Sequence, residues 1–97
     1  MLTLILLHPS EALPLQHWNF EDEPLIRIGR MKDNQVILYS SVVSRYHVEL
    51  RRMGKNWEIV NLGTNGTYLD GKRISQMPVT DKIIIRLAAL VRASKFF

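Results

Sequence analysis

The sequence predicts an all-β domain, and three observations support this prediction. Short apolar and β-branched runs are separated every few positions by turn-forming residues. Residues 46–52 alternate apolar and polar side chains, with the period of a half-buried strand. The dipeptide Asp70-Gly71, between two short runs, is preferred in type I′ hairpin turns. Many short strands at this spacing are typical of a β-sandwich or β-barrel.

Each predicted strand ends where Pro, Gly, Asn, Asp or Ser interrupts an apolar run. The interruptions fall at residues 8–10, at residues 21–24 and at Gly29, and then continue along the chain in the same way. Within residues 46–52, Tyr46 is expected to share the buried face with the other apolar residues. The predicted strands are residues 2–7, 15–20, 25–28, 36–38, 46–52, 57–61, 67–69 and 72–74.

Residues 83–93 fit two different structures. Thr80-Asp81 is suited to cap a helix, and the residues around 87–90 favour one. However, residues 83–85 are three isoleucines, and the apolar positions that follow show no helical stripe. We expect a strand here, because a strand can join a sheet of the predicted fold.

Length and composition restrict the class of protein. The chain has 97 residues, and we expect residues 1–97 to form one domain. It has no cysteine, and no run approaches the ~18 apolar residues of a membrane span. We expect a cytoplasmic domain that does not insert into a membrane. Residues 1–29 carry one basic and four acidic side chains (−3), and residues 30–97 carry twelve and five (+7), which favours an anionic partner.

Three loop motifs form a pattern whose order is more specific than any single piece. They are Ile28-Gly29-Arg30, Val43-Ser44-Arg45-Tyr46-His47 and Asn61-Leu62-Gly63-Thr64-Asn65-Gly66-Thr67-Tyr68-Leu69-Asp70-Gly71. With these motifs, residues 25–87 resemble the forkhead-associated (FHA) domain family of phosphothreonine-binding modules. The resemblance implies an FHA-like β-sandwich of about eleven short, mostly antiparallel strands in two sheets. It also implies that loops at one end bind a phosphothreonine of a partner protein, in signalling or assembly.

The resemblance assigns roles to individual residues. Arg30, Ser44 and Arg45 match phosphate contacts of the family. Thr64 matches a residue that helps to hold the phosphate, and Asn65 matches the asparagine that binds the peptide backbone. His47 matches a structural histidine that holds the Ser44 loop. Gly29, Gly66 and Thr67 match residues with conformational and packing roles.

Elementary chemistry supports the same set of binding residues. A phosphothreonine carries about −1.5 to −2 charges and three strong acceptor oxygens. Its site needs a planar cationic fork, which arginine supplies, together with short hydroxyl and backbone N–H donors.

The chain departs from the family pattern in two places. Asn61 stands where many members have Asp, and residues 87–97 lack the usual glycine between the last two strands.

Other functions find less support in the sequence. Residues 66–72 match part of a P-loop, but Arg73 replaces the Ser or Thr that binds Mg²⁺. Ser44 and His47 are expected on opposite faces, so the imidazole would not activate the hydroxyl. The three histidines show no zinc spacing. We therefore expect no enzyme activity, no metal and no cofactor.

Two alternatives to phosphothreonine binding remain at this point. One is nucleic-acid binding through the basic surface of residues 30–97, although the sequence lacks an RNA-recognition or zinc-finger signature. The other is a degenerate FHA domain that binds an unphosphorylated partner. The favoured partner is a phosphothreonine-containing protein, either a Ser/Thr kinase or a kinase substrate, and not nucleic acid. The domain is also compatible with a place in a longer multidomain protein.

Overall fold

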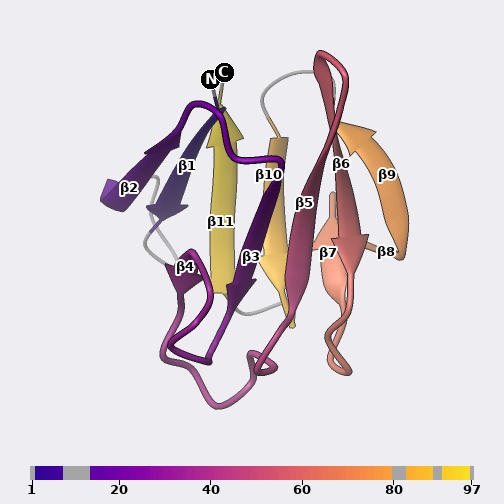
Figure 1. Cartoon of the computed structure of the whole chain (residues 1–97). Helices are drawn as coiled ribbons and strands as arrows, with labels where there is room; N and C mark the ends of the chain where they lie inside the picture. Colours follow the sequence, from indigo (N-terminus) through magenta and orange to yellow (C-terminus); the bar gives the residue numbers. More distant parts are fainter. Residues whose placement is uncertain (1, 8–13, 80–82, 89–90, 97) are drawn as a thin grey trace.

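The structure is a sandwich of two β-sheets (Figure 1). The computed structural model describes residues 2–7, 14–79, 83–88 and 91–96, and these contain eleven strands and no helix. The sheet orders are β2-β1-β11-β10-β7-β8 and β4-β3-β5-β6-β9. The strands are β1 (Leu2–Leu7), β2 (Pro14–Phe20), β3 (Leu25–Gly29), β4 (Val36–Ile37), β5 (Val48–Met53), β6 (Asn56–Asn61), β7 (Thr67–Leu69), β8 (Lys72–Ile74), β9 (Gln76–Val79), β10 (Ile83–Leu87) and β11 (Val91–Phe96). The predicted fold class is confirmed, and the pairing is antiparallel except between β3 and β4.

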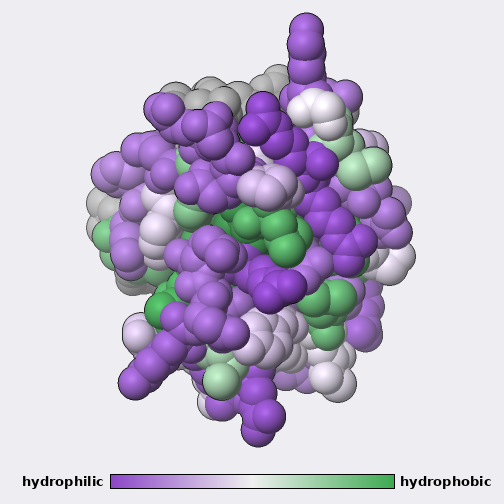
Figure 2. Space-filling view, viewed as in Figure 1, coloured by the Kyte–Doolittle hydropathy of each residue, from purple (hydrophilic) through white to green (hydrophobic). Residues whose placement is uncertain are grey.

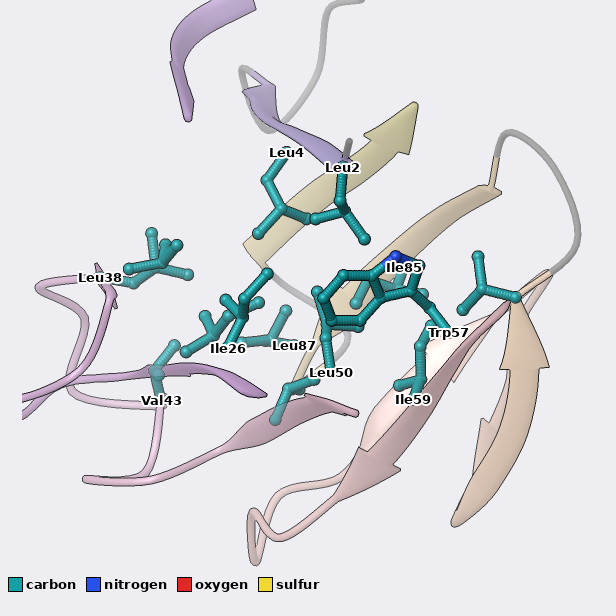
Figure 3. Close-up of a cluster of buried hydrophobic side chains, with 14 residues drawn as sticks. Leu2, Leu4, Ile26, Leu38, Val43, Leu50, Trp57, Ile59, Ile85 and Leu87 are labelled. Atoms are coloured by element: carbon teal, nitrogen blue, oxygen red, sulfur yellow. The ribbon is translucent and has the colours of Figure 1, made fainter. Parts of the chain in front are cut away.

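The core lies between the two sheets (Figure 3). From the six-stranded sheet, side chains of β1 and β10 point inward, and from the five-stranded sheet those of β3, β5 and β6 do so. Each fully buried aliphatic side chain contributes about 1.5–3 kcal/mol, so this layer holds the sheets together. In the same orientation as Figure 1, the visible outer face is mostly hydrophilic, with a small apolar area near its centre (Figure 2).

The strand predicted at residues 46–52 begins two residues later, at Val48. The backbone bends at residues 45–46, so the alternation does not extend back to Tyr46. Tyr46 is therefore exposed instead of buried, and its hydroxyl donates to the Asp33 carboxylate. This hydrogen bond raises the pKa of the Tyr46 hydroxyl above its ordinary value. His47, predicted on the face opposite Val48, is fully buried, as is Val48.

The single strand predicted within residues 83–93 is wrong in its extent, because two paired strands, β10 and β11, lie there; a further strand, β9, was not predicted. β10 and β11 pair with each other, and Ala88 after β10 has a φ of 57°, the region usually left to glycine. The missed strand is β9, a short edge strand whose Pro78 hides it from a pattern search. At the predicted hairpin turn, φ is 50° at Asp70 and 79° at Gly71, so the required positive φ at both positions is confirmed.

Candidate functional site

Three loops meet at the end of the sandwich opposite the chain termini (Figure 1). Residues 30–35 connect β3 to β4, residues 38–47 connect β4 to β5, and residues 62–66 connect β6 to β7. We call these the first, second and third loops. They carry all five predicted binding residues, namely Arg30, Ser44, Arg45, Thr64 and Asn65. The topology thus brings together residues that are up to 35 positions apart in the sequence.

Two hydrogen bonds join the second loop to the third. The Thr64 N–H donates to Ser44 Oγ at 3.3 Å. The Asn65 side-chain amide donates to Val42 O at 3.0 Å. Because Ser44 Oγ accepts in the first of these bonds, its own O–H is left to donate elsewhere. Both loops therefore present polar side chains at one shared edge.

Arg30 joins the first loop to the second. Its Nε donates to Val43 O at 3.0 Å, and its backbone N–H donates to Ser44 O at 3.0 Å. The side chain is nevertheless exposed, and among the described residues its two terminal nitrogens have no protein partner. The bond at Nε orients the guanidinium and leaves its outer edge available for an anion. Arg45 is also exposed.

His47 is fully buried, and it bonds to β3, to the second loop and to the third loop. Its backbone N–H donates to Ile28 O, near the end of β3, at 2.8 Å. Nδ1 accepts from the Ser44 N–H at 3.0 Å, and Nε2 donates to Gly66 O at 2.7 Å. This pattern requires a neutral ring protonated on Nε2. Burial lowers the pKa of the imidazole from 6.5, an effect larger than the opposing one of the bond to Gly66.

The backbones of the first and second loops lie in direct contact. A Cβ at Gly29 would overlap the Arg45 carbonyl, so only glycine permits this approach. Asn34, which is 6% exposed, donates to Met31 O and to Arg45 O, each at 2.8 Å. Asn34 therefore clamps the first loop to the residue after Ser44. Sequence analysis missed this role, because the position carries no local signal beyond that of a turn.

The third loop is held by the end of β6. Asn61 Oδ1 accepts from the Gly63 N–H at 3.1 Å and from Thr67 Oγ1 at 2.9 Å. Although many family members have Asp at this position, the amide oxygen of Asn61 still makes both bonds. Gly66 has a φ of 85°, which favours glycine, and Thr67 is fully buried.

The one acidic side chain of the three loops, Asp33, accepts from the Tyr46 hydroxyl and, in the described part of the chain, forms no ion pair with an arginine. Among the described residues, the two ion pairs both involve Glu49, which accepts from Arg27 and from Arg51 on the outer face of the five-stranded sheet. Arg30 and Arg45 take part in neither pair. Both guanidinium groups are therefore left to bind an external anion.

The expected separation of His47 from the Ser44 hydroxyl is seen in the structure. His47 Nδ1 faces the Ser44 backbone N–H and not the hydroxyl, so it cannot act as a base for Ser44. In the part of the chain that the structure describes, no three His, Cys, Asp or Glu side chains gather as a metal site. The same part contains no helix long and apolar enough to cross a membrane.

Fold and site together define a domain that presents an oriented arginine and hydroxyl donors to a phosphate group. The family model of the FHA domain matches residues 26–88, and the chain belongs to the FHA domain family. It is a module for phosphothreonine-dependent protein–protein interaction.

Relatives support the same assignment. Over 50 residues the chain is 40% identical to an oxoglutarate dehydrogenase inhibitor of Corynebacterium jeikeium, a match that covers 50% of this chain and 35% of the relative. It is 38% identical, also over 50 residues, to the glycogen accumulation regulator GarA of Mycolicibacterium smegmatis, covering 50% of this chain and 32% of the relative. The match thus spans about a third of the length of these relatives.

Solved structures agree over nearly the whole chain. The FhaA FHA domain complexed with the intracellular domain of Rv3910 superposes with a TM-score of 0.81 at 28% identity, covering 98% of this chain and 99% of that one. Mycobacterium tuberculosis EmbR in complex with a low-affinity phosphopeptide superposes with a TM-score of 0.73 at 28% identity, covering 97% of this chain and 24% of that one.

Proposed function

We propose that this domain binds a phosphothreonine through Arg30, Ser44, Arg45, Thr64 and Asn65. In this proposal Arg30 and Arg45 supply the cations, and Ser44 donates its hydroxyl to a phosphate oxygen. Thr64 shapes the pocket beside Ser44. Asn65 binds the peptide backbone next to the phosphothreonine, exchanging its present bond to Val42 O for one to the ligand.

One observation carries the proposal. The outer edge of the Arg30 guanidinium and the Ser44 hydroxyl lie at one loop end, joined through the neighbouring Val43, and neither group is occupied by an acidic partner among the described residues. A dianion at that place would receive charge-assisted hydrogen bonds from both. His47, Gly29, Gly66 and Thr67 act as the support of the site, since each is buried against the three loops.

Exposed apolar side chains on the same loops favour a protein ligand over free phosphate. Met31, Tyr39 and Leu62 are 42%, 81% and 46% exposed. They are placed to contact residues that flank the phosphothreonine, and such contacts are typical of peptide recognition. We propose that the partner is a Ser/Thr kinase or a kinase substrate, bound in the cytoplasm without any chemical step.

Regulation is the biological role that the relatives support. Two of them are named as an enzyme inhibitor and as a regulator of glycogen accumulation. Since the match covers about a third of each, we propose that this domain serves as the phosphothreonine-reading part of a signalling or assembly protein, alone or within a longer chain.

A phosphopeptide titration tests the proposal. A phosphothreonine peptide is first selected from a degenerate library, and calorimetry then compares its phosphothreonine, phosphoserine and unphosphorylated forms. We expect the phosphothreonine form to bind and the unphosphorylated form not to bind. The phosphoserine form should bind at least tenfold more weakly than the phosphothreonine form. One methyl group in an apolar pocket is worth about 1–3 kcal/mol, which gives this factor.

The same titration separates the two alternatives. Binding that survives phosphatase treatment would identify a degenerate domain and overturn the proposal. Steeply salt-dependent binding of an oligonucleotide, with no preference for the phosphorylated peptide, would identify a nucleic-acid binder instead.

A further inference from the structure

A row of two arginines and a tyrosine crosses the outer face of the six-stranded sheet. The register pairs Arg73 of β8 with Tyr68 of β7, and Tyr68 with Arg86 of β10. Residues beside the row point into the sandwich: Ile85 and Leu87 beside Arg86, Thr67 and Leu69 beside Tyr68, and Ile74 beside Arg73. Because side chains alternate along a strand, the three members of the row point outward together.

The row adjoins the third loop of the proposed phosphothreonine site. Arg73 Nη2 donates to Thr64 O at 3.1 Å. A Cβ at Gly66 would lie 2.8 Å from Arg73 Nε and 3.2 Å from Tyr68 Cε1, so both side chains cover that residue. On the other side of the row, the Ala88 N–H, two residues after Arg86, donates to Gly66 O at 2.8 Å.

Thr64 links the two sites and limits the distance between them. Its N–H bonds to Ser44 Oγ at 3.3 Å, and its carbonyl accepts from Arg73 Nη2 at 3.1 Å. Since the N and O atoms of one residue are about 3 Å apart, the Ser44 hydroxyl and the Arg73 guanidinium are separated by no more than about 10 Å. An extended peptide covers that span in about three residues.

The charge of the row is not compensated within the described part of the chain. Neither Arg73 nor Arg86 takes part in an ion pair there, in contrast to the arginines around Glu49. Two cations flanking one aromatic ring form a surface that attracts a carboxylate or a phosphate, and the tyrosine adds a rigid wall.

We propose that Arg73, Tyr68 and Arg86 form a second anion site, which takes a carboxylate or a second phosphate located within about three residues of the phosphothreonine on the same peptide. This proposal rests on the function proposed above and narrows its ligand to acidic or doubly phosphorylated segments. Arg73 and Arg86 are specificity-determining residues in it, whereas Arg30 and Ser44 supply the basal affinity.

The test uses matched peptides and matched variants. The selected phosphothreonine peptide is made with alanine at all flanking acidic positions, with one aspartate at each position up to three residues away, and with a second phosphothreonine at the best of these. The proteins are the wild type, Arg73→Gln, Arg86→Gln and a control, Lys55→Gln. Lys55 lies in the β5–β6 turn, at the end of the sandwich opposite the three loops (Figure 1).

We expect the best aspartate to strengthen binding to the wild type about fivefold over the alanine peptide, the upper range for an exposed ion pair. The second phosphate should do so by more, since it carries up to two charges. Arg73→Gln and Arg86→Gln should each reduce this preference to less than twofold. Lys55→Gln should retain the preference, and thermal melts should show that all variants are folded.

The outcomes separate this proposal from the one that it rests on. If the wild type binds only phosphorylated peptide but shows no flanking preference, or if Arg86→Gln retains that preference, the second site is overturned and the phosphothreonine site stands. Arg86 makes no side-chain bond to the third loop among the described residues, so Arg86→Gln decides the question even if Arg73→Gln disturbs Thr64. Binding of an oligonucleotide that requires both arginines and does not compete with peptide would overturn the peptide assignment.

Discussion

The arginines of the five-stranded sheet and those of the loop end are used in opposite ways. On the sheet, Arg27 and Arg51 donate to the two carboxylate oxygens of Glu49, whose side chain is only 12% exposed. At the loop end, Arg30 donates one bond to a backbone carbonyl, and Arg45 is exposed. The first pair is satisfied inside the protein, whereas the second retains its capacity for an external anion.

This difference shows why net charge alone is a poor guide to function. The same residue type contributes little to binding where an acidic neighbour occupies it, and much where the backbone orients it and no acid is paired with it. The comparison assigns recognition to arginines without an acidic partner and predicts that the paired arginines, Arg27 and Arg51, are close to neutral for binding.

The largest expected effect is that of Arg30→Ala on phosphopeptide affinity. A charge-assisted bond contributes about 1.5–3 kcal/mol and a bidentate pair contributes more, so the variant should bind more than a hundredfold more weakly. The lost bond to Val43 O should cost the fold only about 0.5–1.5 kcal/mol. Calorimetry measures the affinity, and circular dichroism checks the fold.

Arg30→Lys is the matched control for this variant. An ammonium group keeps the charge but not the planar fork, so binding should recover only in part. A folded Arg30→Ala protein with wild-type affinity would remove Arg30 from the site and end the contrast between the two groups of arginines.

The next effect concerns stability. His47→Ala removes a fully buried ring that bonds to Ser44 N and Gly66 O. Leaving these partners unsatisfied should lower the free energy of unfolding by about 1–3 kcal/mol, and the melting temperature with it. Asn65→Ala, at an exposed position, should melt closer to the wild type while it weakens peptide binding. Thermal melts that rank these variants in the reverse order would exchange their roles.

A smaller effect is the pH dependence that His47 contributes. Burial lowers the pKa of the folded imidazole from 6.5, so below that pH the unfolded chain binds more protons than the folded one. Stability from this group is complete above pH 6.5 and is lost as the pH falls below it, at no more than about 1.4 kcal/mol per unit. Denaturant unfolding between pH 7.5 and 5.5 measures the slope, which His47→Gln should flatten. A slope that persists in this variant would place the titrating group elsewhere.

The sequence predicted those parts of the fold that depend on neighbours along the chain. The Asp70-Gly71 turn and most strand boundaries follow from turn chemistry and local patterning. Tyr46 was placed on the wrong face because the bend at residues 45–46 comes from contacts between loops, such as that of Gly29 with the Arg45 carbonyl. Local sequence does not contain this information.

The candidate site shows the same limit. Its exposed donors were named from an ordered motif, and the structure places them on three converging loops. The clamp of Asn34 and the position of Arg73 over Gly66 were not predicted, because each depends on a partner brought close only by the tertiary fold. The roles of the binding residues themselves stay predictions until variants are measured.

The smallest expected effect is that of Arg51→Ala, and it completes the comparison. The Arg51 side chain is 45% exposed, and its pair with Glu49 is a surface ion pair, worth about 0–1 kcal/mol. Arg51 lies three residues from Val48, where β5 begins directly after the second loop, so it is about 10 Å along the strand from that loop. Screening at physiological salt acts over about 8 Å. We therefore expect phosphopeptide affinity within twofold of the wild type in the same calorimetric assay. If Arg51→Ala instead weakened binding as much as Arg30→Ala, affinity would follow total positive charge, as nucleic-acid binding predicts, and not the oriented arginine of the loop end.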